Sequence, residues 1–289
     1  MKLALHINDY SGIGPPARMA SALARIAATA EDTGFSRLSL TDHLWQVSMV
    51  GEEYEPMLES YTTLGYLAAR TRTIELQTLV TAAMYRPPGL LAKIVTTLDV
   101  LSGGRAWLGV GAGWNEEEAS GLGLPHAAQA ERFAHLEETL RICLQMWSDS
   151  TDSFVGEHYQ LAGTLNSPQA LTRPHPRILV GGGGERVTLR IAAQYADAFN
   201  VFGGRDAGQK VARLREHCEK LGRDFDAVEK TAFLPLDVTA PADLEAALAD
   251  LRRLHELGFT TVYAAVADIG SVTPLETLGS KVIPEIAAW

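Results

Sequence analysis

The chain has 289 residues, of which 46% are hydrophobic and 21% charged, a balance typical of a soluble globular protein with a large core. Its 35 acidic and 25 basic residues give a net charge of −10, which disfavours nucleic acid or an anionic membrane as the main partner. No apolar run approaches the roughly 20 residues that span a bilayer, and the N-terminal MKLALHIND becomes polar too early for a signal peptide. With only two widely spaced cysteines, Cys143 and Cys218, we expect reduced thiols and a cytoplasmic protein.

Short apolar segments alternate with amphipathic helical patterns from one end of the chain to the other, which indicates repeated strand–helix units. The helical patterns place apolar residues three and four positions apart, as at Phe133, Leu136, Leu140, Cys143 and Trp147. The predicted strands are, in chain order, Lys2 to Ile7, Arg37 to Thr41, Ile74 to Thr81, Arg105 to Gly109, Ile178 to Val180, Ala198 to Phe202, Glu229 to Leu236 and Thr261 to Val266.

Eight strand–helix pairs predict a (β/α)8 barrel, or TIM barrel, because closing eight parallel strands removes both edges of the sheet. We expect residues 1–289 to form this single domain, since no linker interrupts the pattern. Residues 148–177 depart from the rhythm and contain SFVGEHYQL, which predicts a short hairpin inserted before strand five. We expect this insertion to overhang the mouth of the barrel.

Two glycine-rich segments follow neighbouring strands at the carboxyl-terminal end of the barrel, where functional groups gather. GVGAGWN follows strand four, and four consecutive glycines link strand five to a helix. Backbone amides at such a loop approach a phosphate closely, and the helix N-terminus adds partial positive charge; a tight packing turn is the alternative interpretation. Neither segment has the full dinucleotide fingerprint. Together the two strand ends would leave a slot for a flat ring with a phosphorylated tail.

Polar side chains follow strand two at the same end of the barrel. Asp42 and His43 come directly after this strand, and a histidine there can donate a proton or a hydrogen bond near neutral pH. Alternatively, Asp42 caps the next segment and His43 is packed.

Further candidates for substrate contact are His6 and Asn200 at strand ends, and Trp45 and Trp114 on loops at the mouth. His6 is as readily a core histidine with a protein partner. The tryptophans would wall an apolar pocket or simply anchor their loops.

Other chemistry is disfavoured by the motifs. The run Glu116 to Glu118 is most simply a solvated first helical turn, to which we assign no catalytic role. The chain has no HExxH and no G-x-S-x-G motif, and its eight histidines are scattered without ligand spacing, so we expect no metal. An organic cofactor would supply the reactivity that these side chains lack.

Four segments together resemble the bacterial luciferase-like monooxygenase superfamily, particularly its deazaflavin (coenzyme F420)-dependent oxidoreductases. They are LTDHL (40–44), EPMLESYTTLGYLAARTRTIEL (55–76), LVTAAMYRPPGLLAKIVTTLDVLSGGRAWLGVGAGWNEEE (79–118) and RPHPRILVGGGGERVTLRIAAQYADAFN (173–200). The resemblance covers nearly the whole chain, and it implies a (β/α)8 barrel that acts as a homodimer.

The resemblance also implies roles for individual residues. Asp42 and His43 would lie at the reactive edge of the deazaflavin, with His43 as proton donor or ring-orienting group and Asp42 positioning it or hydrogen-bonding the cofactor. The family has a non-prolyl cis peptide behind the ring, for which Leu79–Val80 is the best match. The ring and ribityl chain would be lined by Thr81, Gly111, Ala112, Gly113 and Asn115, and the phosphate would be held by Gly181, Gly182, Gly183 and Gly184.

One departure bears on the substrate. In the family's sugar-phosphate dehydrogenases a glutamate follows the strand-four glycines as proton donor, whereas this chain has Trp114 there. We therefore expect hydride transfer between reduced or oxidised deazaflavin and a small apolar or aromatic substrate. The alternatives are an FMN/FMNH2-dependent monooxygenase of the luciferase type, since a similar slot accepts either ring, and a non-catalytic flavin- or deazaflavin-binding protein.

Overall fold

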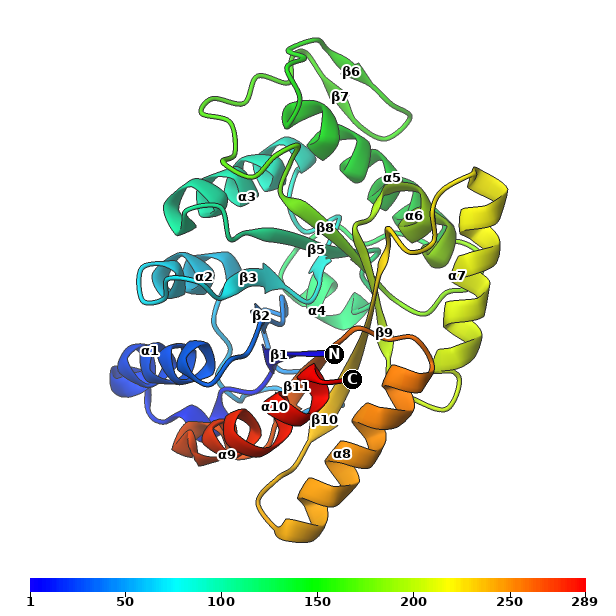
Figure 1. Ribbon diagram of the computed structural model, residues 1–289. Helices are drawn as coiled ribbons and strands as arrows, with labels where there is room; N and C mark the ends of the chain where they lie inside the picture. Colours follow the sequence, from blue (N-terminus) through cyan, green and yellow to red (C-terminus); the bar gives the residue numbers. More distant parts are fainter.

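Eight parallel strands form the wall of a barrel in the computed structural model, which describes residues 1–289 (Figure 1). Each strand pairs with the next, and a bridge between Leu76 and Ala106 joins the two ends of the sheet. The predicted (β/α)8 barrel is thereby confirmed. The wall consists of β1 (Lys2–Ile7), β2 (Arg37–Leu40), β3 (Glu75–Thr78) with its continuation β4 (Thr81–Ala82), β5 (Trp107–Gly111), β8 (Arg177–Gly181), β9 (Ala198–Phe202), β10 (Glu229–Leu236) and β11 (Thr261–Val266).

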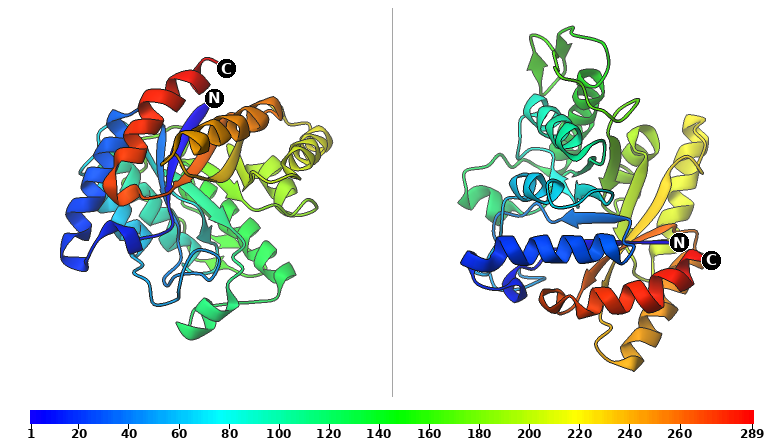
Figure 2. Two further views of the ribbon diagram at one scale, coloured as in Figure 1. Left: turned by 90° about the horizontal axis from the view of Figure 1, so that it is seen from below. Right: turned by 60° about the vertical axis from the view of Figure 1, so that its left-hand side comes forward.

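Helices surround this wall and cover its outer face (Figure 2). In α1 the residues Met19, Leu23, Ile26 and Ala30 recur at helical spacing and are buried, so one stripe of the helix packs on the sheet. None of the helices combines the length and the apolar character that a membrane crossing requires. The helices are α1 (Pro16–Asp32), α2 (Ser60–Ala68), α3 (Pro88–Ser102), α4 (Glu116–Gly121), α5 (Gln129–Met146), α6 (Thr188–Tyr195), α7 (Ala207–Leu221), α8 (Pro241–Glu256), α9 (Thr273–Thr277) and α10 (Ile283–Ala287).

The inserted segment forms the predicted hairpin, with β6 (Phe154–Val155) antiparallel to β7 (Gln160–Leu161). Its contacts are with the outer helices: Lys93 of α3 donates to the Ser167 carbonyl at 2.6 Å, and Glu138 of α5 accepts three backbone N–H groups of the turn. The hairpin lies at the rim of the molecule beside α3 and α5 (Figure 1). Its expected position over the mouth of the barrel stays a prediction.

A buried ion network fills the barrel interior near the amino-terminal ends of the strands. Arg37 donates to Glu75 at 2.6 Å, to Glu229 at 2.8 Å and to the Tyr263 hydroxyl at 3.2 Å. Its guanidinium also lies 3.9 Å from the centroid of the Trp107 ring. Burial alone would raise the pKa of Glu229, but Arg37 outweighs this and lowers it. The interior at this end of the barrel is thus filled by mutually compensating charges.

We expect Arg37→Ala to lower the free energy of unfolding by roughly 3–5 kcal/mol, because it leaves the partly buried Glu229 carboxylate without its main partner. Guanidinium denaturation followed by tryptophan fluorescence measures the loss. The control is Arg252→Ala, which removes an ion pair to Glu285 that is exposed on both sides and should cost less than about 1 kcal/mol. Equal losses in the two variants would contradict the structural role of Arg37.

Candidate active site

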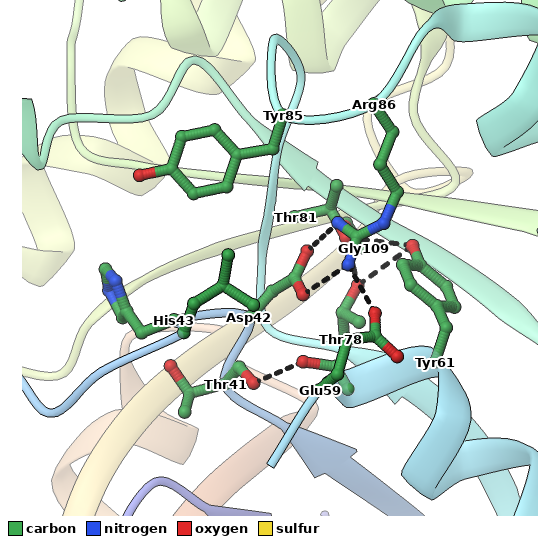
Figure 3. Close-up of polar contacts among 12 residues, drawn as sticks. Thr41, Asp42, His43, Glu59, Tyr61, Thr78, Thr81, Tyr85, Arg86 and Gly109 are labelled. Atoms are coloured by element: carbon green, nitrogen blue, oxygen red, sulfur yellow. Dashed lines mark hydrogen bonds and ion pairs between the residues drawn. The ribbon is translucent and has the colours of Figure 1, made fainter. Parts of the chain in front are cut away.

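The loop after β2 carries Asp42 and His43 to the carboxyl-terminal end of the barrel, where Arg86 meets it (Figure 3). Both carboxylate oxygens of Asp42 accept from Arg86, at 2.6 and 3.0 Å, and the Asp42 side chain is fully buried. Arg86 also donates to Glu59 at 2.6 Å, and Glu59 caps the start of α2 by accepting from the Thr62 N–H. Arg86 therefore ties the β2 loop to α2, a role that its position in the sequence did not indicate.

His43 is positioned by Glu118, not by Asp42. The Nδ1 atom of His43 lies 2.9 Å from Glu118 Oε2, and the Leu44 N–H donates to the other carboxylate oxygen. The Tyr85 hydroxyl donates to Oε2 at 2.8 Å. The expectation that Asp42 orients His43 is corrected by this geometry, because Arg86 occupies the Asp42 carboxylate.

Glu118 is fully buried, whereas Glu116 and Glu117 are exposed. The expectation of a solvated glutamate run is therefore wrong for its third member. Asn115 caps α4 by accepting from the Glu118 N–H at 3.2 Å, and this fixes where the helix begins and turns Glu118 inward. The sequence shows the capping residue Asn115 and the acid Glu118 three positions later, but it does not show that Glu118 will meet the loop after β2.

The charge on Glu118 determines the protonation of the ring beside it. Burial would raise the pKa of Glu118, but His43, the Leu44 N–H and the Tyr85 hydroxyl together lower it. Glu118 is thus a carboxylate near neutral pH and only accepts hydrogen bonds, so His43 carries a proton on Nδ1. Its Nε2 is then the nitrogen left for chemistry. The His43 ring also meets Trp114 edge to face, with 5.4 Å between centroids.

The third strand is interrupted between β3 and β4 by a cis peptide bond at Leu79–Val80, which confirms the position expected from the resemblance. Thr81, expected to line a ring, is fully buried and shares its hydroxyl with Tyr61 and Thr78, at 2.8 and 2.9 Å. Thr78 in turn donates to the Gly109 carbonyl at 2.9 Å. These hydroxyls therefore brace the interrupted strand (Figure 3).

Val80 explains why glycine stands at the ends of β5 and β8. A Cβ on Gly111 would lie 2.9 Å from a Val80 methyl carbon, and one on Gly181 would lie 2.8 Å from another. The side chain of Val80 thus occupies the space that these two residues leave open, between two strand ends without bulk. Gly111 and Gly181 are therefore required for packing against Val80. Because these two residues have no side chains, backbone borders Val80 on both sides, which suits a flat ring.

The glycine loop after β8 provides free backbone donors. The Gly182 N–H donates to the Asn200 carbonyl at 3.0 Å, whereas the N–H groups of Gly183 and Gly184 donate no hydrogen bond within the chain. Both residues are exposed and lie just before α6. Two unpaired amides near a helix N-terminus fit an anionic group such as a phosphate.

His6 and Asn200 are buried and hydrogen-bonded within the protein. His6 is buried and lies 2.9 Å from the Ser39 hydroxyl through Nδ1, and burial lowers its pKa to about 3, so the ring is neutral. Asn200 is also buried and donates to the Thr231 hydroxyl at 2.9 Å. Both residues are satisfied by protein partners, and their contact with substrate stays a prediction.

The two tryptophans differ in exposure. The ring of Trp45 packs against Gly121 of α4, where any side chain would collide with it, so Trp45 anchors its loop. Trp114 is 54% exposed beside His43. Phe202 at the end of β9 was not among the predicted residues; it is 70% exposed and meets Phe233 edge to face.

Comparison with known proteins agrees with this geometry. The family model described as luciferase-like monooxygenase matches residues 6–271. An F420-dependent glucose-6-phosphate dehydrogenase from Nakamurella multipartita is 32% identical over 80% of this chain and 67% of its own length. The pyrimidine monooxygenase RutA from Acinetobacter baylyi is 31% identical over 68% of this chain and 53% of its own length. The matches therefore span from about half to two thirds of these relatives.

Solved structures share the fold at low sequence identity. An F420-dependent secondary alcohol dehydrogenase in complex with an F420–acetone adduct superposes with a TM-score of 0.81 at 16% identity, covering 99% of this chain and 98% of that one. A coenzyme F420-dependent tetrahydromethanopterin reductase from Methanopyrus kandleri gives 0.78 at 17% identity, covering 99% and 100%. At these identities the likeness shows the barrel alone.

We expect Glu118→Gln to lower the free energy of unfolding at pH 7 by roughly 1–3 kcal/mol, because the amide satisfies its buried partners less well. The folded-state pKa of Glu118 is lowered, so its contribution is present above the unfolded value of about 4.3 and lost as the pH falls through the folded value. Denaturation curves between pH 7 and pH 3 should therefore converge for wild type and variant. Glu117→Gln, one residue away and exposed, is the control, and parallel curves for wild type and Glu118→Gln would refute the assignment.

Proposed function

The chain belongs to the luciferase-like monooxygenase family, and from that premise we propose that it is an F420-dependent oxidoreductase acting on a small apolar or aromatic substrate. The observation that carries the proposal is that the His43–Glu118 pair, the Val80 surface and the free amides of the glycine loop all follow strands at the carboxyl-terminal end of the barrel. The relatives named as F420-dependent dehydrogenases support the choice of cofactor.

The residues present fit a deazaflavin. Val80, between Gly111 and Gly181, would face the ring, with Leu79, Ala112, Gly113 and Asn115 nearby on the same strand ends. The unpaired amides of Gly183 and Gly184 would hold the phosphate. When bound, the deazaflavin supplies the atom that donates or accepts a hydride. The protein supplies binding, orientation and proton transfer.

His43 holds or moves the proton at Nε2. The Glu118 carboxylate accepts the Nδ1–H and orients the ring, so a proton on Nε2 can pass to a developing alkoxide or carbanion of the substrate. In the opposite direction neutral Nε2 accepts the proton of a substrate hydroxyl. Tyr85 and the Leu44 N–H complete the hydrogen bonding of Glu118, which keeps the carboxylate in place during either step.

Exposed aromatic rings favour an apolar substrate. Trp114 stands beside His43, and Phe202 is exposed at the end of β9. Trp114 also takes the position at which the resemblance places an acid in sugar-phosphate dehydrogenases. A large apolar wall lowers the free energy of binding an alkyl or aryl group and offers nothing to a phosphorylated sugar.

The alternative with FMN and oxygen draws support from the pyrimidine monooxygenases among the relatives, and the non-catalytic alternative needs only the binding surface. We propose that the protein acts as a homodimer in the cytoplasm with residues 1–289 as one domain. The resemblance supports the dimer, and two buried, unpaired cysteines are compatible with a reducing compartment.

Titration of the apo protein with F420 and with FMN tests the cofactor. We expect F420 to bind with a micromolar or lower Kd, read from the change in deazaflavin fluorescence, and FMN to bind at least tenfold more weakly. FMN binding without F420 binding would overturn the proposal in favour of the monooxygenase, and tight F420 binding without turnover over a broad substrate panel would favour a binding protein.

Replacing His43 tests the proton-transfer role. We expect His43→Ala to keep the Kd for F420 within about threefold and to slow hydride transfer by about 10²- to 10⁴-fold, because only the proton transfer is lost. Stopped-flow absorbance of the deazaflavin measures the rate with a substrate found in the panel. Glu117→Gln should react like wild type, and undiminished transfer in His43→Ala would exclude the role of His43.

A further inference from the structure

A second cluster of metal-ligating side chains lies on the outer helical layer, at the start of α5. Glu131 and His135 stand one turn apart on α5, and His158 lies in the turn between β6 and β7. One ligand atom from each of the three side chains lies within 4.8 Å of the other two. The two imidazole rings are 4.3 Å apart between centroids, and His135 Nε2 lies 3.7 Å from Glu131 Oε1.

The turn that carries His158 is held firmly on α5. Glu138 accepts from the N–H groups of Glu157, His158 and Tyr159 at 2.7, 3.1 and 2.9 Å. A side chain at Gly156 would collide with the Glu138 carboxylate, so glycine permits this close approach. The backbone of His158 is therefore fixed relative to α5 before any ligand arrives, which reduces the entropy cost of assembling the three donors.

The contacts within the chain satisfy this cluster only weakly. A separation of 3.7 Å exceeds a hydrogen bond, and the two imidazoles share none. The Nδ1 atom of His135 is buried without a partner, while the Tyr159 ring packs edge to face against the imidazole at 5.0 Å. Packing thus restrains His135 while leaving its polar atoms without strong partners.

We propose that Glu131, His135 and His158 bind a divalent transition-metal ion of the zinc type. Two imidazole nitrogens and one carboxylate oxygen suit Zn²⁺, and water would complete the coordination. Bonds of about 2.0–2.2 Å to a tetrahedral ion place donors roughly 3.3–3.6 Å apart, so the three ligand atoms, now within 4.8 Å of one another, have only to draw together slightly. Glu131 is exposed and free to rotate. The ion would link the inserted hairpin to α5, a structural role independent of the activity proposed for the mouth.

Isothermal titration with ZnCl2 tests the site on the full-length, untagged protein after treatment with EDTA. We expect one Zn²⁺ per chain with a micromolar or lower Kd, and at least tenfold weaker binding in His135→Gln and in His158→Gln. The matched control is Glu157→Gln, which removes an exposed acid next to His158 but no proposed ligand, and its Kd should stay within twofold. Zinc binding that is absent in wild type, or unchanged in both histidine variants, would overturn the proposal.

Hydrogen exchange of the wild-type protein gives a second measurement that needs no variant. Amides in residues 154–161 should exchange at least severalfold more slowly with saturating ZnCl2 than with EDTA, because the ion would close the hairpin onto α5. Exchange that is unchanged in this segment would argue against the site. Both readouts are independent of cofactor binding and turnover, so failure here leaves the function proposed for the mouth intact.

Discussion

The buried carboxylate of Glu118 is the constraint on which the arrangement of the mouth depends. A desolvated charge is stable only where donors surround it, and those donors come from different parts of the chain: His43 and Leu44 after β2, and Tyr85 after β4. Satisfying one acid therefore fixes two loops and the start of α4 at once. The imidazole tautomer follows from the same requirement, because a carboxylate accepts and does not donate.

Arg86 performs the complementary task on the other side of the β2 loop. By using both oxygens of Asp42, it leaves Glu118 as the orienting partner of His43 and ties the loop to the N-terminus of α2. The charged groups at the two ends of the barrel thus have different roles. The Arg37 network near the amino-terminal ends is closed and stabilises the fold, whereas the His43–Glu118 pair leaves one ring nitrogen without a protein partner.

The glycines around Val80 connect packing with binding. They are required by the close approach of a valine side chain, and the same absence of side chains leaves the backbone surface that a flat cofactor needs. The amides of the next two glycines remain unpaired, which suits the anionic tail of such a cofactor. Packing against Val80 therefore explains Gly181, and anion binding explains Gly183 and Gly184 of the same loop, so the two explanations do not compete. The inserted hairpin lies outside this arrangement, on the helical layer, where His158 approaches His135 of α5.

The sequence by itself determined the eight-stranded barrel, and for four of the eight strands it predicted both the first and the last residue correctly. It also placed Asp42 and His43 at the mouth, and the family resemblance gave the position of the cis peptide bond. These follow from local periodicity and short motifs, which reflect how one segment packs against a common core. Only the tertiary structure decided which polar groups pair with one another. Arg86 is 44 residues from Asp42 along the chain, and Glu118 is 75 residues from His43. The hairpin was predicted, but its place against α5 and the approach of His158 to His135 were not. Local patterns specify which face of an element is buried; which polar groups meet there depends on how distant elements pack, because a buried charge is satisfied by whatever the fold brings within hydrogen-bond distance.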